Sequence, residues 1–100
     1  MSKVLVLSGD GIGQEIVAQA LKVIEYLNKN DSLNMELVHG LIGGTAYDET
    51  GSPLPQATLD AAHECDSILL GAVGGYQWEA LKRDLRPESG LLGLRAEMDL

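Results

Sequence analysis

The sequence predicts an α/β fold in which a mostly parallel sheet is flanked by helices. Two continuous apolar runs, residues 3–8 and 67–73, are typical of strands that are buried on both faces, as strands are in parallel sheets. Between them lie a segment with the apolar spacing of an amphipathic helix and a shorter strand-like segment. Strands that alternate with helices in this order indicate βαβ units with right-handed crossovers.

The first half of the chain is predicted to form a strand, a helix and a second strand. The strand over residues 3–8 is ended by the turn Gly9-Asp10-Gly11. The helix begins near Ile12, and the polar residues 28–31 break it. Residues 34–39 largely alternate apolar and polar side chains and predict the second strand, which Gly40 closes. The apolar positions of the helix recur at helical spacing, at Ile16, Ala20, Val23, Ile24 and Leu27.

The second half begins with a stretch rich in turn-forming residues. Glycine and proline recur between residues 43 and 55, which predicts turns there, and Pro55 suits the first turn of a helix over residues 56–64. The apolar run 67–73 forms the third strand and ends at Gly74-Gly75. Residues 86–100 predict a loop that leads into a short helix without a terminator, so the chain is expected to be the amino-terminal piece of a longer protein.

Charge and cysteine content limit the classes of protein to which this chain can belong. The 15 acidic and 7 basic residues give a net charge of −8, which argues against a nucleic-acid partner or an anionic membrane surface. The apolar run near the start is too short to span a membrane, and no signal-peptide cleavage site follows it. The single cysteine, Cys65, cannot form an internal disulfide and is interpreted as a half-buried helix residue. These features favour a cytoplasmic protein.

Two glycine-rich turns follow predicted strands and are candidates for ligand contact. In the first, residues 8–13, a dinucleotide fingerprint would need a third glycine at position 14, which is Gln14, so the turn is either a plain tight turn or a ligand-contacting one. The second, residues 71–75, lies at the strand ends where open α/β sheets bind ligands. Tyr76 and Trp78 follow it and either line a binding crevice or cap the core.

The most informative constellation is Glu88, Leu91, Leu92 and Arg95. These residues are spaced to lie on one face of a helix. Such a stripe could bind a ligand with a branched apolar group and a carboxylate, because arginine presents a planar fork of donors. The alternative is an ordinary amphipathic helix whose leucines lie in the core and whose charged ends reach water.

The remaining polar groups give weaker signals. His39 and His63 have no Cys or carboxylate partners at ligand spacing and are interpreted as structural or surface residues. The acidic pair Asp48-Glu49 precedes Gly51 and is interpreted as a solvated turn. No catalytic or metal-binding residue is therefore predicted within the 100 residues.

Several segments together resemble the NAD-dependent β-decarboxylating dehydrogenases, the family of isocitrate and isopropylmalate dehydrogenases. Residues 9–13 followed by Glu15 resemble the family's opening G-D-G-I-G-P-E, and residues 43–48 resemble its G-G-x-A-x-D, with residues 53–59 fitting the segment after it. Residues 69–75 with Trp78 resemble L-L-G-A-V-G-G-P-K-W. The resemblance extends over the whole chain and keeps its spacing, so it implies the first strand-helix-strand units of the isopropylmalate dehydrogenase-like fold.

The segment from Arg86 to Arg95 resembles the family's R-P-E-x-G-L-L-x-L-R and points to the isopropylmalate-specific branch. Isocitrate dehydrogenases carry at the equivalent position a serine that meets the extra carboxylate of their substrate, whereas two leucines imply an isopropyl group. The resemblance implies that Arg95 binds a malate-type carboxylate, that Leu91 and Leu92 contact the isopropyl group, and that Glu88 lies between the substrate and the nicotinamide ribose. It also implies a cofactor-binding segment made of Gly75, Tyr76, Gln77, Trp78, Glu79, Ala80, Leu81, Lys82, Arg83, Asp84, Leu85, Arg86, Pro87 and Glu88.

The resemblance further implies a reaction and partners for the complete enzyme. The substrate would be 3-isopropylmalate of leucine biosynthesis, oxidised by NAD⁺ and decarboxylated to 4-methyl-2-oxopentanoate, with Mg²⁺ or Mn²⁺ polarising the oxygen. The complete enzyme would be a homodimer. Residues 1–100 would be the amino-terminal part of its larger, cofactor-side domain. The catalytic residues and metal ligands are expected beyond residue 100, so the isolated piece is expected to be inactive and to leave an apolar sheet edge uncovered.

Two departures from the family pattern concern the cofactor side. Gln14 replaces a proline after the first glycine turn, and Tyr76-Gln77 replaces Pro-Lys before Trp78. Neither touches the leucine-arginine stripe. The alternatives that remain are a related decarboxylating dehydrogenase acting on homoisocitrate, tartrate or isocitrate, and a small non-enzymatic module that binds a nucleotide at the first glycine turn.

Overall fold

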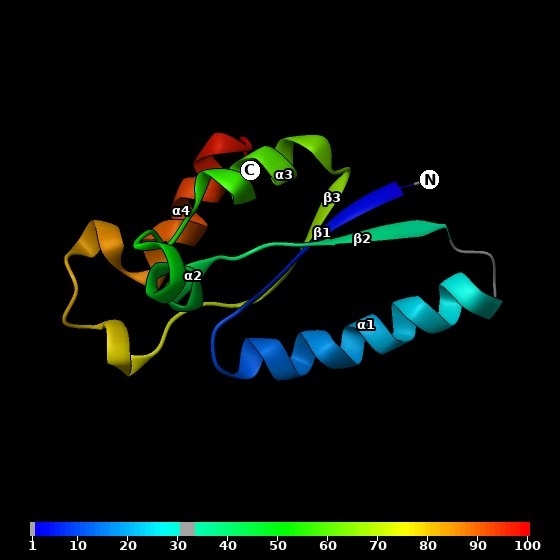
Figure 1. The fold of residues 1–100 in the computed structure, drawn as a ribbon, viewed down its shortest axis with the longest axis horizontal. Coiled ribbons are helices and arrows are strands. Elements are labelled where there is room, and N and C mark those ends of the chain that lie inside the picture. The colour runs from blue at the N-terminus through cyan, green and yellow to red at the C-terminus, as the bar shows by residue number, and fades with distance from the viewer. Residues whose placement is uncertain (1, 31–33) are drawn as a thin grey trace.

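The computed structural model describes residues 2–30 and 34–100, which form a three-stranded sheet with helices on both faces (Figure 1). The elements in chain order are β1 (Ser2–Gly9), α1 (Ile12–Asn30), β2 (Met35–His39), α2 (Gly43–Thr50), α3 (Gln56–Glu64), β3 (Ser67–Ala72), the 3-10 turns η1 (Tyr76–Trp78) and η2 (Arg83–Leu85), and α4 (Pro87–Glu97). Within these ranges, no helix combines the length and the apolar character needed to cross a membrane.

The sheet is parallel, with strand order β2-β1-β3. In its register, Leu5 of β1 lies between Val38 of β2 and Ile68 of β3. As the central strand, β1 is covered on both faces, which explains why residues 4–7 are all apolar and buried. The predicted α/β fold with a parallel sheet is confirmed.

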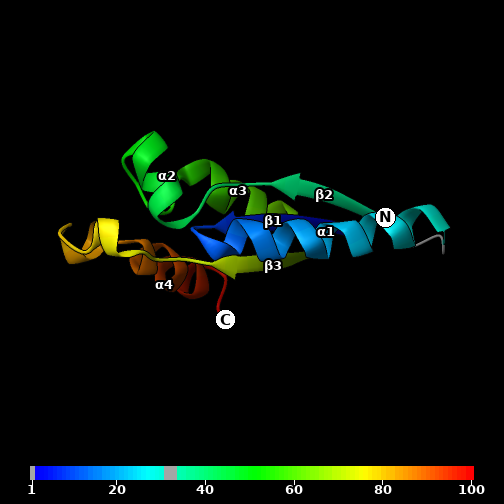
Figure 2. The same ribbon diagram turned by 90° about the horizontal axis from the view of Figure 1, so that it is seen from below.

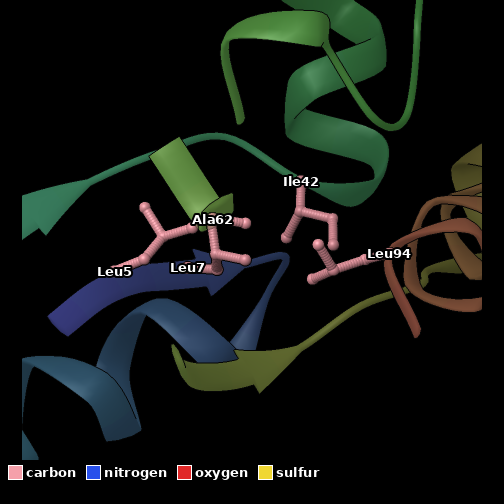
Figure 3. Packing of buried hydrophobic residues seen from close by; sticks show 5 residues of the cluster. All are labelled: Leu5, Leu7, Ile42, Ala62 and Leu94. Atoms are coloured by element: carbon pink, nitrogen blue, oxygen red, sulfur yellow. The ribbon is translucent and has the colours of Figure 1, made fainter. Parts of the chain in front are cut away.

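The two faces of β1 belong to two separate apolar clusters. Val4 and Val6 pack with Val17 of α1, whereas Leu5 and Leu7 pack with residues of the opposite layer. Accordingly, α1 lies on one side of the sheet, and α3 and α4 lie on the other (Figures 1 and 2). Figure 3 shows the second cluster, which consists of Leu5, Leu7, Ile42, Ala62 and Leu94.

The first helix is longer than the sequence predicts. Residues 28–31 are polar and were expected to break it, but α1 continues to Asn30. Asn28 explains the difference, because its side chain both donates to the carbonyl oxygen of Met35 and accepts from the amide of Met35, each at 3.1 Å. A residue that favours helix ends by its own propensity is thus retained in the helix by bonds to β2. Position 31, the last of the predicted breakers, lies outside the described residues.

The segment predicted as turns contains a helix. Residues 43–50 form α2, although the segment begins with two glycines and its N-cap residue, Ile42, has no side chain that can accept a hydrogen bond. The helix ends as expected, at Gly51 in the left-handed conformation with φ 84°. The prediction of turns over the whole of residues 43–55 was wrong because the cap of α2 comes from a distant residue, described below.

The last helix has a terminator, which the sequence did not predict. α4 begins at Pro87, directly after Arg86. It is closed by hydrogen bonds from the Leu100 amide to the Arg95 carbonyl oxygen (2.8 Å) and from the Asp99 amide to the Ala96 carbonyl oxygen (3.3 Å), with Asp99 at φ 58°. This is a Schellman motif in which aspartate takes the place usually held by glycine. Because no glycine marks the helix end, the motif could not be predicted from the sequence pattern.

Candidate functional site

The first glycine turn brings α1 close to the ends of β1 and β3. A Cβ on Gly9 would overlap the carbonyl group of Ala72, and one on Gly13 would overlap the carbonyl oxygen of Ser8. Gly9 and Gly11 also have positive φ values of 79° and 51°. A tight turn that lets helix and strands approach closely therefore accounts for these glycines, which is the first of the two interpretations the sequence left open.

Asp10, in the middle of that turn, connects three segments of the chain. Its side chain is buried, with 2% of the residue exposed. Oδ2 accepts from the amides of Gly44 (2.8 Å) and Gly74 (2.9 Å), while Oδ1 accepts from the amide and the hydroxyl of Thr45 (2.7 and 2.8 Å). All four donors are neutral, and two of them are first-turn amides of α2. Asp10 thus supplies the cap that Ile42 cannot, and its charge lies favourably at the N-terminus of the helix.

The sequence pattern did not predict that Asp10 caps α2 and holds the loop after β3. Three motifs noticed separately, at residues 9–13, 43–48 and 71–75, meet at its carboxylate. Gly43 makes room for it, since a Cβ there would lie 2.5 Å from Oδ2, whereas Gly44 makes room for the Trp78 ring and Gly74 for the Glu88 carboxylate. The available signal was a lone acidic residue between glycines, directly after a buried strand.

Trp78 caps the core, and Tyr76 does not. The Trp78 ring lies against Gly44, where a Cβ would overlap it, and its Nε1 donates to Oδ1 of Asp48 at 3.1 Å. Trp78 is 7% exposed, whereas Tyr76 is 86% exposed. The interpretation of Asp48 as part of a solvated turn is therefore corrected, because it is a residue of α2 that anchors the indole.

A cavity of about 560 Å³ lies along the predicted cofactor segment. Both walls come from the same stretch of chain: η1 with its preceding glycine on one side, and the start of α4 on the other. The lining residues are Gly75, Tyr76, Trp78, Glu79, Arg86, Pro87 and Glu88. Glu88 also reaches back to the end of β3, where a Cβ on Gly74 would lie only 2.8 Å from its Oε1. The cavity lining thus contains seven of the fourteen residues that the resemblance assigned to the cofactor.

The predicted stripe on α4 faces away from the core. The helix buries Pro87, Gly90 and Leu94, and Gly90 touches the backbone of the loop before α3 so closely that a Cβ would overlap Pro53. On the remaining surface, Leu92 is 64% exposed, Glu88 and Arg95 are exposed, and Leu91 is half-buried. The alternative in which this leucine pair lies in the core therefore does not hold for Leu92, because Leu94 fills the core position.

The histidines and Cys65 lie where the sequence placed them. His39 is exposed, and His63 is an exposed residue whose Nε2 lies 3.6 Å from Oε1 of Glu97. Cys65 is half-buried at the end of α3, against the second apolar cluster. Within residues 2–30 and 34–100, no three His, Cys, Asp or Glu side chains are grouped so that they could hold a metal ion.

Comparison with known proteins identifies the family to which this chain belongs. The model of the isocitrate/isopropylmalate dehydrogenase family matches residues 3–100, and the chain belongs to that family. The 3-isopropylmalate dehydrogenase of Hydrogenovibrio crunogenus is 55% identical over 98% of this chain and 28% of its own length. The enzyme of the same name from Methylococcus capsulatus is 58% identical over 98% of this chain and 27% of its own length. The chain thus spans little more than a quarter of the curated relatives it matches.

Solved structures show the same fold. The β-decarboxylating dehydrogenase of Thermococcus kodakarensis, in its apo form, superimposes with a TM-score of 0.78 at 27% identity, over 99% of this chain and 27% of its own. The isocitrate dehydrogenase of Methylococcus capsulatus gives a TM-score of 0.61 at 35% identity, over 75% of this chain and 22% of its own. The three-stranded parallel sheet with its flanking helices is therefore shared with dehydrogenases of this family.

Proposed function

We propose that the complete protein is a 3-isopropylmalate dehydrogenase, which oxidises the 2-hydroxyl of its substrate with NAD⁺ and releases CO₂ to give 4-methyl-2-oxopentanoate. The observation that carries the proposal is the solvent-facing stripe of α4, in which Leu92 is 64% exposed while Leu94, two residues on, is 2% exposed. A leucine left outside the core next to an exposed arginine is explained by a ligand with an apolar branch and a carboxylate. Relatives named for this activity, at more than half identity, support it.

In this proposal each residue of the stripe has a physical role. Arg95 binds the malate-type carboxylate through its guanidinium fork, which also orients the substrate for hydride transfer. Leu91 and Leu92 contact the isopropyl group, and this shaped apolar contact distinguishes the substrate from one that carries a further carboxylate. Glu88 lies between the substrate and the nicotinamide ribose, since it belongs both to the stripe and to the cavity beside it.

The cavity fits the cofactor part of the proposal. Its volume of about 560 Å³ is that of a small-molecule site, and its lining lies wholly within residues 75–88. Gly74, directly before the lining residues, leaves room for the Glu88 carboxylate, because a Cβ at position 74 would lie 2.8 Å from its Oε1. NAD⁺, when bound, accepts the hydride. Residues 1–100 would then be the amino-terminal part of the larger, cofactor-side domain of a cytoplasmic homodimer.

The metal part of the proposal has a different basis. Because the described residues offer no cluster that fits a divalent cation, we assign none of them to Mg²⁺ or Mn²⁺. Metal ligands and catalytic acid and base groups are proposed to lie in the part of the enzyme that corresponds to the remaining length of its relatives.

The test uses the complete protein encoded by the gene that contains this sequence. NADH formation is measured with 3-isopropylmalate, isocitrate, homoisocitrate and tartrate, with and without added Mg²⁺ or Mn²⁺. We expect kcat/KM for 3-isopropylmalate to exceed the others by about 100-fold or more, because an apolar pocket leaves unpaired the third carboxylate of isocitrate and homoisocitrate and the second hydroxyl of tartrate. A preference for isocitrate, homoisocitrate or tartrate, or a reading frame that ends at Leu100, would overturn the proposal.

A further inference from the structure

We propose that Asp10 is the positioning residue of the cofactor site: it holds the loop that follows β3 in the conformation that the nicotinamide cofactor requires. The inference rests on the proposed function, and it assigns a role there to a residue in the turn that follows β1. Asp10 does not line the cavity. It acts through Gly74, whose amide donates a hydrogen bond to Oδ2 of Asp10 at 2.9 Å.

The loop after β3 is tied to Asp10 at Gly74, whose amide donates to Oδ2. Gly74 has φ 111°, a conformation that residues other than glycine rarely adopt, and it directly precedes the cavity-lining residues. Glycine can adopt this and other conformations at little cost, so a partner for its amide helps to select one of them. The hydrogen bond to a buried carboxylate selects this one, because charge-assisted bonds to backbone amides are among the strong ones.

Gly74 in turn lies beside the carboxylate of Glu88. The Oε1 atom of Glu88 is 2.8 Å from the place where a Cβ on Gly74 would be, so the carboxylate rests against the loop backbone. A displacement of Gly74 therefore moves one wall of the cavity and the carboxylate proposed to face the nicotinamide ribose. Asp10, Gly74 and Glu88 thus form a continuous chain of contacts from the buried turn to the site.

The substrate stripe has a separate support. α4 buries Leu94 in the cluster with Leu5 and Leu7, and packs Gly90 on Pro53. None of these contacts of Leu94 and Gly90 involves Gly74. Loss of the Asp10 bonds should therefore disturb the cofactor more than the substrate, which distinguishes a positioning role from general loss of stability.

The test compares Asp10→Asn with Thr58→Val in the complete enzyme. Asparagine places an amide NH₂ among four donors, so it cannot satisfy them all. Thr58 is 3% exposed and its hydroxyl donates to the Leu41 carbonyl oxygen, so Thr58→Val also removes a buried hydrogen bond but leaves the loop untouched. Both variants are expected to unfold at lower temperature, by about 5 °C.

The kinetic readout is the split between the two Michaelis constants. For Asp10→Asn we expect KM for NAD⁺ to rise about tenfold while KM for 3-isopropylmalate changes by less than about twofold, whereas Thr58→Val should change neither by more than about twofold. Equal rises in both constants for Asp10→Asn, or the same rise in KM for NAD⁺ for Thr58→Val, would overturn the proposal.

Two further measurements keep the test decisive. If Asp10→Asn does not fold, Thr45→Val removes the hydroxyl bonds to Oδ1 and to the Gly9 carbonyl oxygen but keeps the three amide bonds to Asp10, and we expect a rise in KM for NAD⁺ of about threefold; no rise would overturn the proposal. Hydrogen–deuterium exchange over residues 74–86 is independent of activity and should accelerate in Asp10→Asn but not in Thr58→Val. An inactive wild-type enzyme would refute the proposed function, and unchanged exchange would refute the role of Asp10.

Discussion

Truncation of Leu92 to alanine should separate substrate recognition from stability. The side chain is 64% exposed, so Leu92→Ala is expected to change the free energy of unfolding by less than about 0.5 kcal/mol. If Leu92 contacts the isopropyl group, the variant loses apolar contact worth about 0.8 kcal/mol per buried CH₂. Three carbon atoms are removed, so the loss in transition-state binding is about 2 kcal/mol, or about 30-fold in kcat/KM.

The matched control is Leu94→Ala, the same truncation two residues along the same helix. Leu94 is 2% exposed and packs with Leu5, Leu7, Ile42 and Ala62, so its truncation should lower the free energy of unfolding by about 2–5 kcal/mol. Urea unfolding measures this difference between the two variants. The control shows what the loss of a core leucine does and therefore identifies any indirect effect on activity.

The decisive assay compares 3-isopropylmalate with malate, which lacks the isopropyl group. For Leu92→Ala, kcat/KM should fall about 30-fold with 3-isopropylmalate and by less than about threefold with malate. An equal fall with both substrates would refute the assignment, because the leucine would then act on something other than the isopropyl group. A loss of stability as large as that of Leu94→Ala would refute the claim that Leu92 lies outside the core.

Three further predictions concern stability and association. Gly44→Ala should lower the free energy of unfolding by about 1–3 kcal/mol, since its methyl group would overlap the Trp78 ring; wild-type stability in urea would contradict the packing. Trp78→Phe loses the hydrogen bond to Asp48 and should cost about 1 kcal/mol in the same assay, and a gain in stability would contradict that bond. The isolated 100-residue chain should self-associate in sedimentation experiments, because α1 exposes an apolar stripe; a monomer with cooperative unfolding would contradict this. The stripe consists of Ile12, Ile16, Val23 and Tyr26.

The sequence predicted the parts of the fold that are set by local pattern. The buried strand β1 and the helix Gln56–Glu64 follow from an apolar run and from Pro55, because burial on both faces needs continuous apolar sequence. The apolar run 67–73 also predicted a strand, but β3 lies at the edge of the three-stranded sheet and its residues 68–72 are only half-buried. The sequence misled where a distant group decides the local structure. α2 has a poor start of its own and forms because Asp10 caps it from 34 residues away. Periodicity cannot reveal such a cap, since it reports only on neighbours along the chain.

The candidate site likewise has one part that the sequence predicted and one that it could not. The spacing of Glu88, Leu92 and Arg95 predicts a common helix face, which α4 confirms by leaving all three exposed. Whether that face packs inward or outward could not be known from the spacing, because Leu94 has the same apolar character as Leu92. The choice is made by Gly90, whose lack of a side chain lets α4 approach Pro53 and so turns the Leu94 side of the helix to the core.

The same physical logic links the glycines to the site as a whole. A buried carboxylate without enough donors would be strongly destabilising, so Asp10 can be retained only if backbone amides come within hydrogen-bonding distance. They reach it in part because position 43 carries no Cβ, which would lie 2.5 Å from Oδ2, and their bonds draw the start of α2 and the loop after β3 to one point. Trp78 then packs over Gly44 from that loop, which fixes one wall of the cavity. The glycine motifs at the start of α2 and after β3, which are unrelated in the sequence, therefore form one structural unit. The geometry of this unit depends on the carboxylate of Asp10 at its centre.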